Sequence, residues 1–481
     1  MNNIKQSLFS EHNYAIILVF RYHHYDYDSN IPGELYDMEN DLHRAYWLAT
    51  ERFNIPKSNI TIITDIPPQQ DEKADPWEPL QQKDQGFRLV RIHRHKPIRK
   101  TKNSREQTSI KTRIQNEFEP GAILEDEYTP SIEVVIKELI RFMELTIHGI
   151  KSKGSCVPKI FFYTSMHGDL IPVNRKRSLI ETVEEVSFVT KADSNDQSVV
   201  SNKGDPNYDN ALIFTNSTGT GRCYLYNKVI FDILFGRIPV KLGTNSKGEK
   251  CGKISIPIVH RFGFSPKIVF DERLYTLSIT PVPKMLYNHG IPPETNILAI
   301  FDTCHSASLS RFHYTYIPES RRMEFCELYQ DTAEEFKDLN KLPVCVSLSA
   351  TSDYKEAPSI RGLGSPFTFQ LYTGLSQCKT KLTVSQAYDL IINTLPNSMK
   401  DCCPTISSTS NDPNSHLPFM EETKERISMR ANSPARSLIQ FEKTKGDIKL
   451  FIRNFGKKTL TSGKTEKTLT PDEGVNKHII V

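Results

Sequence analysis

The chain has 481 residues, which is enough for a large core and for two or three domains of ordinary size. A net charge of +4, a hydrophobic content of 38% and the lack of a long apolar run exclude a membrane-spanning or strongly nucleic-acid-binding chain. The nine cysteines include no CxxC pair, so no metal site is assigned and free thiols are expected. We therefore expect a cytoplasmic protein, with the nucleus as the alternative.

Apolar periodicity predicts strands and helices that alternate along the chain. Strands are predicted at 14–20, 59–65, 159–169, 296–301, 343–351 and 402–409, and helices at 37–55, 131–145, 224–235, 365–375 and 383–395. The strand in 159–169 is expected to break at the pair formed by His167 and Gly168. This order is typical of an α/β fold with a six-stranded, mostly parallel sheet flanked by helices.

The distribution of the predicted strands and helices also indicates how the chain is divided into segments. Residues 67–130 and 236–295 lack clear periodicity and are expected to be large insertions. A short N-terminal extension (1–13) should precede the domain (14–420), and a basic C-terminal tail (421–481) should follow it. The domain itself is expected to comprise a large segment (14–310), a linker (311–342) and a small segment (343–420).

The first insertion carries an uneven share of the positive charge. Residues 88–113 contain ten Lys or Arg and a single acid, Glu106, with few aromatic rings that could stack on bases. We expect a basic loop here. A nucleic-acid surface, a nuclear-import signal and an accessible cleavage site are the alternatives.

Two reactive residues follow predicted strands. In parallel sheets, ligands collect at the carboxyl ends of the strands, and both His167 and Cys304 lie just beyond such ends. A histidine beside a cysteine can take its proton and later protonate a leaving amine. The backbone N–H groups of Gly168 and Cys304 could then form an oxyanion hole. His305 is the rival base, but as the next residue it should point away from Cys304. The alternative for each residue is inert packing or an ordinary loop position.

These residues lie in blocks that resemble the metacaspases, a family of caspase-like cysteine peptidases. The histidine block is "YTSMHGD" (163–169) and the nucleophile block is "DTCHSA" (302–307). The remaining matches follow the family's order: 40–41, 349–353, 362–368 and 404–408 with 418–419. The resemblance implies the caspase-like (caspase-hemoglobinase) three-layer fold for 14–420, with Cys304 as nucleophile and His167 as acid and base.

The resemblance also implies an endopeptidase that cleaves after Arg or Lys. A cationic side chain needs buried carboxylates, and the aligned candidates are Asp41 and Asp302, with Asp353 as a third. The alternative for Asp41 is an exposed or capping acid of a helix. We expect a monomer that acts on protein or peptide substrates and binds neither membranes nor nucleic acids. Met166 and Ala307 stand where the family has glycines. The alternative is therefore a catalytically weak or inactive caspase-like scaffold or regulator.

Activation is also predicted by the resemblance. No cofactor is required, and calcium activation is left open because acids follow the histidine block and carboxylates suit calcium. These acids are Glu181, Glu184, Glu185, Asp193, Asp196, Asp205 and Asp209. Family members often cut themselves between the two segments, so self-cleavage after Arg321 or Arg322 is predicted, with plain solvated charges as the alternative.

Overall fold

The structure is a computed structural model in which two units are distinguished, Met1–Ile427 and Ser428–Val481. It describes residues 12–22, 34–66, 87–91, 123–124, 131–152, 158–172, 208–215, 222–235, 240–244, 250–262, 269–279, 295–330, 344–378, 381–395, 401–420, 438–444 and 447–453.

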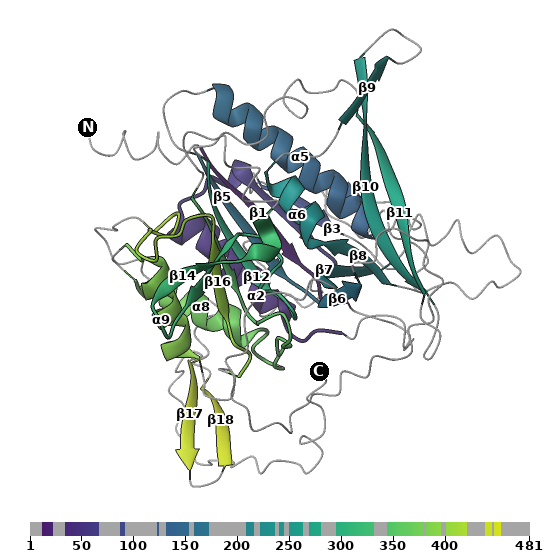
Figure 1. The fold of residues 1–481 in the computed structure, drawn as a ribbon. Helices are drawn as coiled ribbons and strands as arrows, with labels where there is room; N and C mark the ends of the chain where they lie inside the picture. The colour runs from purple at the N-terminus through teal and green to yellow at the C-terminus, as the bar shows by residue number, and fades with distance from the viewer. Residues whose placement is uncertain are drawn as a thin grey trace, which may run out of the picture. The chain divides into compact units, whose positions relative to one another are not determined.

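A ten-stranded, mostly parallel sheet forms the centre of the first unit (Figure 1). Three of its central strands consist mainly of apolar residues, and nearly all their side chains are buried, because both faces of the sheet are covered. Seven neighbouring strands run parallel, and the last three at one edge pair antiparallel. In spatial order the strands are β14 (Arg322–Phe325), β13 (Tyr314–Ile317), β16 (Thr405–Ser408), β15 (Cys345–Ser349), β12 (Asn296–Asp302), β5 (Lys159–Ser165), β1 (Asn13–Val19), β2 (Ile60–Thr64), β3 (Arg88–Arg91) and β4 (Ile123–Leu124).

Helices cover the two faces of this sheet. Alternate side chains of β1, such as Ile16 and Leu18, join a core cluster built with α5 (Ser131–Ser152) and α6 (Asn227–Leu234). A second group of helices packs together through the middle one, which contacts the other two, and the first of them also contacts β1 and β5. This group comprises α2 (Met38–Trp47), α8 (Pro366–Gln377) and α9 (Val384–Thr394). A π-helical turn (Leu48–Arg52) extends α2, and 3-10 turns lie at Lys57–Asn59 and Glu327–Tyr329.

A second sheet is entirely antiparallel and contributes side chains to the same core cluster. Its strands are, in order, β11 (Val269–Ile279), β10 (Lys250–Phe262), β8 (Arg222–Tyr226), β7 (Tyr208–Thr215) and β6 (Gly168–Pro172), with β9 (Val240–Thr244) paired to β10. The strand β6 begins directly after His167, so this sheet continues from the end of β5.

The α/β class and the mostly parallel sheet between helices are confirmed, but the predicted number of six strands is too small. The six predicted strands are present as β1, β2, β5, β12, β15 and β16. The sheet continues into β3 and β4 beyond β2, and into β13 and β14 beyond β16. These edge strands have four residues or fewer, and such short segments carry too little periodicity to be recognised.

Several segments that were predicted as insertions, a linker or a helix contain strands in the structure. The basic stretch begins as β3, and the predicted linker contains β13 and β14. The second insertion supplies β9, β10 and β11. The predicted helix at 224–235 starts as the end of β8, because residues 224–226 pair with β7, and only then becomes α6.

The described residues of the second unit form a hairpin within the predicted tail. The strands β17 (Leu438–Thr444) and β18 (Asp447–Arg453) pair antiparallel. None of the helices described in either unit has the length and apolar character that a bilayer crossing requires. The proposed extension, 1–13, lies outside the described residues up to residue 11, and Asn13 already belongs to β1.

Candidate active site

Cys304 and His167 occupy equivalent positions beyond two neighbouring parallel strands. In the register of β12 and β5, Asp302 pairs with Ser165, and the Met166 N–H donates to the Asp302 carbonyl oxygen at 3.3 Å. Cys304 and His167 each lie two residues beyond that pair. The hydrophobic strands therefore bring the predicted nucleophile and the predicted base to the same point of the sheet edge.

Gly168 is required by the contact between these two strand ends. A Cβ placed on Gly168 would lie 2.1 Å from the Cys304 carbonyl oxygen and 3.1 Å from the Thr303 hydroxyl oxygen. Only a residue without a side chain fits there. The sequence predicted an oxyanion-hole N–H at this glycine, and the structure shows that the close approach of the Cys304 backbone already demands a residue without a side chain. Its role in an oxyanion hole stays a prediction.

The surroundings of Cys304 favour the neutral thiol over the thiolate. Its Sγ accepts a hydrogen bond from the Ala357 N–H at 3.2 Å. Burial raises the pKa of Cys304 to about 12, and the nearby acids Glu356 and Asp169 act in the same direction, while the Ala357 N–H opposes them. A thiolate must therefore form when a base or a substrate changes this environment.

His305 is directed to a different partner. Its Nδ1 lies 2.8 Å from the Asp353 carbonyl oxygen, and since a carbonyl only accepts, Nδ1 carries the proton. The backbone of His305 is in the left-handed region with φ of 52°, and its N–H donates to the Lys355 carbonyl oxygen at 2.9 Å. The ring is thus held against the loop that follows β15.

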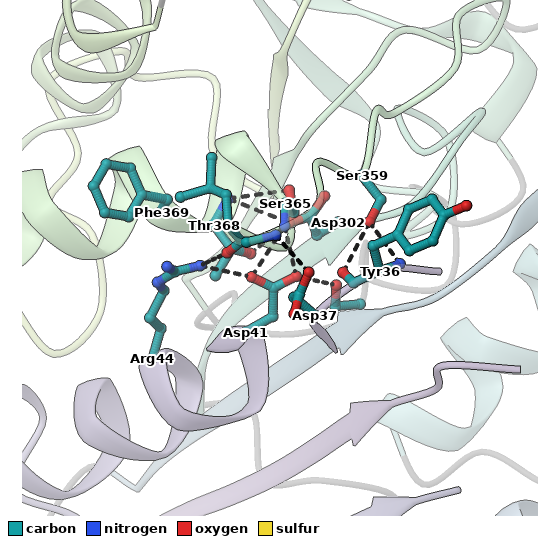
Figure 2. Close-up of polar contacts among 12 residues, drawn as sticks. Tyr36, Asp37, Asp41, Arg44, Asp302, Ser359, Ser365, Thr368 and Phe369 are labelled. Atoms are coloured by element: carbon teal, nitrogen blue, oxygen red, sulfur yellow. Dashed lines mark hydrogen bonds and ion pairs between the residues drawn. The ribbon is translucent and has the colours of Figure 1, made fainter. Parts of the chain in front are cut away.

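Asp41, on α2, is fully buried and accepts hydrogen bonds from several elements (Figure 2). The Ser365 N–H, at the start of α8, lies 2.9 Å from Oδ2 and 3.2 Å from Oδ1. The Ser165 hydroxyl donates to Oδ2 at 3.3 Å and links Asp41 to the end of β5. The Arg44 Nη1 donates to Oδ1 at 3.0 Å.

Asp302 is the second buried acid of this cluster. It accepts hydrogen bonds from the Thr368 N–H at 3.2 Å and from the Thr368 hydroxyl. Burial raises the pKa of Asp302 to about 6. Burial also raises the pKa of Asp41 to about 8; Arg44 opposes this shift and the charge of Asp302 adds to it. Two of the three predicted substrate-binding acids therefore lie together and influence each other.

Arg44 supplies a cation to this acidic cluster from within the chain. Besides Asp41, its Nη1 contacts the Leu363 carbonyl oxygen at 2.7 Å, and its Cζ lies 4.9 Å from the centre of the Phe369 ring (Figure 2). Neither Arg44 nor Ser165 was predicted as a site residue from the sequence. The spacing of three residues between Asp41 and Arg44 on a helix was the available signal for the ion pair, whereas nothing local marked Ser165.

Asp353 belongs to a separate cluster, which involves the loop that follows Cys304. It accepts hydrogen bonds from the Ser308 N–H at 2.8 Å, from the Ser308 hydroxyl, and from the Asn210 side-chain amide at 2.9 Å. Burial raises its pKa to about 6. These contacts tie the loop after Cys304 to β7, whereas Asp41 and Asp302 face Ser365 and Thr368.

Arg321 and Arg322 lie where β13 turns into β14. Their side chains are 72% and 67% exposed. Arg321 has a φ of 51° and lies 3.5 Å from a carboxylate oxygen of Asp389. The predicted self-cleavage residues are therefore accessible but sit in a tight turn.

The acids proposed for calcium lie outside the described residues, except Asp209. That residue, at the start of β7, has a carboxylate oxygen 3.8 Å from Nη1 of Arg311. Within the described segments, no group of three or more His, Cys, Asp or Glu residues could hold a metal ion. Calcium activation stays a prediction, as does the role of residues 92–113, which the structure does not describe.

Comparisons with known proteins add little to this geometry. No family model matches the chain, and no curated protein compared with it is similar. Among solved structures, the chain is similar to the crystal structure of protein GSU0716 from Geobacter sulfurreducens, with 12% identity and a TM-score of 0.37 over 85% of this chain and 99% of that one. A similarity this weak carries no argument about function.

Proposed function

We propose that this protein is a metacaspase-like cysteine endopeptidase that cleaves peptide bonds after Arg or Lys. The observation that carries the proposal is the register of β12 and β5, which places Cys304 and His167 at equivalent positions beyond two adjacent parallel strands. A nucleophile and a base that come from distant segments are thereby presented at the sheet edge where α/β enzymes bind their substrates.

The reaction follows from the two side chains. His167 takes the proton from the Cys304 thiol, and the sulfur then forms a bond with the carbonyl carbon of the substrate. The N–H groups of Gly168 and Cys304 stabilise the negative oxygen that develops. His167 returns the proton to the leaving amine as the C–N bond breaks, and water afterwards hydrolyses the thioester.

The acidic cluster supports the preference for a basic residue before the cleaved bond. Asp302 lies two residues before the nucleophile, and Asp41 is linked through Ser165 to the end of the strand that carries His167. Buried carboxylates at this edge favour a guanidinium or an ammonium group. Arg44 contacts Asp41 and offsets part of the negative charge of the two carboxyl groups. A substrate cation bound beside Asp41 and Asp302 therefore interacts with less than two full negative charges.

A fluorogenic peptide ending in Arg tests this function, with and without added calcium. We expect hydrolysis that is abolished in Cys304→Ala and His167→Ala and retained in Cys403→Ala, which removes an exposed thiol. A peptide ending in Asp should not be cleaved. Equal cleavage of both peptides would contradict the proposed specificity, and activity in Cys304→Ala would contradict the proposed nucleophile.

An inactive caspase-like scaffold is the second candidate, and two observations favour it. Burial raises the pKa of Cys304 to about 12, and Arg44 occupies a carboxylate that a substrate would need. An Arg-directed electrophile separates the candidates. Selective modification of Cys304 that disappears in His167→Ala supports the peptidase, and an unmodified Cys304 in folded protein supports the scaffold.

A further inference from the structure

A third residue, Tyr22, reaches the sheet edge where Cys304 and His167 meet. The strands β1, β5 and β12 are neighbours in the sheet, and the three residues follow their respective carboxyl ends. The β1 ladder continues past the last residue of the strand, since the Phe20 N–H donates to the Ser165 carbonyl oxygen at 3.0 Å. Tyr22 is therefore placed beside the strand end that carries His167.

The backbone holds Tyr22 in an unusual conformation. Its φ is 59°, which is rare for a residue with a large side chain. Asp65, just after β2, accepts the N–H of Tyr22 at 2.9 Å and that of Arg21 at 2.6 Å. The side chain of Tyr22 is fully buried. A strained and fully buried residue that two hydrogen bonds hold in place is a rigid support for its neighbours.

The Tyr22 hydroxyl connects the backbone of His167 to the backbone of β7. It accepts the His167 N–H at 3.2 Å and donates to the Ile213 carbonyl oxygen at 2.6 Å. The Ile213 N–H in turn donates to the His167 carbonyl oxygen at 3.1 Å. The hydroxyl and β7 thus close a small ring of hydrogen bonds around the backbone of His167.

The Tyr22 ring supports the imidazole itself. The two ring centres are 4.8 Å apart and the planes are inclined by 46°. We propose that Tyr22 is a positioning residue, which holds the His167 imidazole in the orientation that serves the Cys304 thiol. This inference rests on the proposed function of the Cys304 and His167 pair, and Tyr22 itself exchanges no proton in it.

A positioning role predicts a loss in kcat with little change in KM, since Tyr22 makes no contact with substrate. A misplacement of about 1 Å can cost roughly a hundredfold in rate. We expect Tyr22→Phe, which keeps the ring and loses the hydroxyl, to lower kcat for the Arg peptide about tenfold. Tyr22→Leu loses both contacts and should lower kcat about a hundredfold.

The experiment measures kcat, KM and the His167 resonance in the full-length chain. Histidine labelled at Cε1 gives one signal for each of the 14 histidines, and His167→Ala identifies the relevant one. The ring current of Tyr22 should displace this signal, and Tyr22→Leu should return it toward the position of an unstacked histidine. Tyr316→Phe is the matched control, because it removes a hydroxyl from a buried tyrosine on β13.

The outcomes separate the positioning role from the proposed function. Unchanged kcat in both Tyr22 variants, an unmoved His167 signal in folded Tyr22→Leu, or an equal loss in Tyr316→Phe overturns the role of Tyr22. If Tyr22→Leu does not fold, the loss of kcat in Tyr22→Phe, which keeps the ring and loses only the hydroxyl, decides. A wild-type chain without activity or labelling overturns the proposed function, and the His167 signal still decides whether Tyr22 positions the imidazole.

Discussion

At the scale of single residues, the site depends on Gly168, because other backbone atoms occupy the space that a side chain would need. A Cβ on Gly168 would meet the Cys304 carbonyl oxygen at 2.1 Å, and a backbone atom cannot swing aside as a flexible side chain does. We expect Gly168→Ala to destabilise the fold by about 1–3 kcal/mol, as measured by urea unfolding.

A second glycine provides the control for this substitution. Gly374→Ala places a methyl against the end of Leu390, at 2.8 Å from Cδ2. That side chain can shift, and alanine also favours the helix α8 by up to about 1 kcal/mol. The cost should therefore be smaller than for Gly168→Ala, and equal costs would contradict the argument from rigid packing.

The buried acid Asp41 predicts a dependence of stability on pH. The unfolded chain loses this proton near the ordinary pKa of 3.8, whereas the folded chain keeps it up to about 8. Between these values the folded state binds more protons, so raising the pH favours unfolding. The free energy of unfolding of Asp41→Asn, relative to wild type, should therefore rise from about pH 5 to about pH 8.

Urea unfolding at these two pH values measures that difference. Asp401→Asn, which changes an exposed acid, is the control and should follow wild type. The asparagine variant alters the contact with Arg44 at every pH, so the informative quantity is the slope with pH and not the absolute stability. A slope equal to that of wild type would show that Asp41 is ionised throughout this range.

At the scale of elements, the basic stretch starts as a structural strand. Arg88, on β3, donates from Nε and Nη2 to both carboxylate oxygens of Glu138 on α5, at 2.6 and 2.7 Å. Glu138 is almost fully buried, so losing this partner leaves an uncompensated charge. We expect Arg88→Ala to lower the free energy of unfolding by about 3 kcal/mol, the lower end for a buried pair, because the Arg88 side chain is partly exposed.

An exposed ion pair gives the comparison for Arg88. Arg322 lies 2.9 Å from Glu324, and both side chains reach solvent. Such pairs contribute little, so Arg322→Ala should cost less than about 0.5 kcal/mol. Similar costs for the two variants would indicate that β3 is not anchored to α5 in solution.

The hairpin of β13 and β14 is the element in which self-cleavage is predicted. Arg321 and Arg322 are exposed there, but the left-handed turn must open before the chain can fit a peptidase site. We expect slow cleavage after one of these arginines, detected by mass spectrometry of purified protein. Fragments that persist in Cys304→Ala would show that another protease makes the cut.

At the scale of the whole chain, the division into two units predicts the effect of truncation. The described part of residues 428–481 is a single two-stranded hairpin, which is at most marginally stable alone. A chain that ends at Ile427 should keep its melting temperature within about 2 °C, measured by thermal unfolding. It should also cleave the Arg peptide as the full chain does. A large loss of either would show that the tail stabilises the first unit.

The sequence by itself determined the central strands of this protein and the placement of Cys304 and His167 beyond two of them. Continuous apolar runs predict buried parallel strands, and residues after such runs must share one edge of the sheet. Cys304, His167 and the α/β class follow from that local reasoning. The edge strands could not be predicted in this way, because two to four residues carry too little periodicity.

Only the tertiary structure decided what surrounds the reactive residues. The contact between Arg44 and Asp41 depends on the turn of a particular helix. The hydrogen bond from the Ala357 amide to the Cys304 sulfur and the contact between the Tyr22 and His167 rings depend on segments that are distant in the sequence. Hydrogen bonds and burial set the charge of an acid or a thiol. These are properties of the folded surroundings, which the order of residues alone does not reveal.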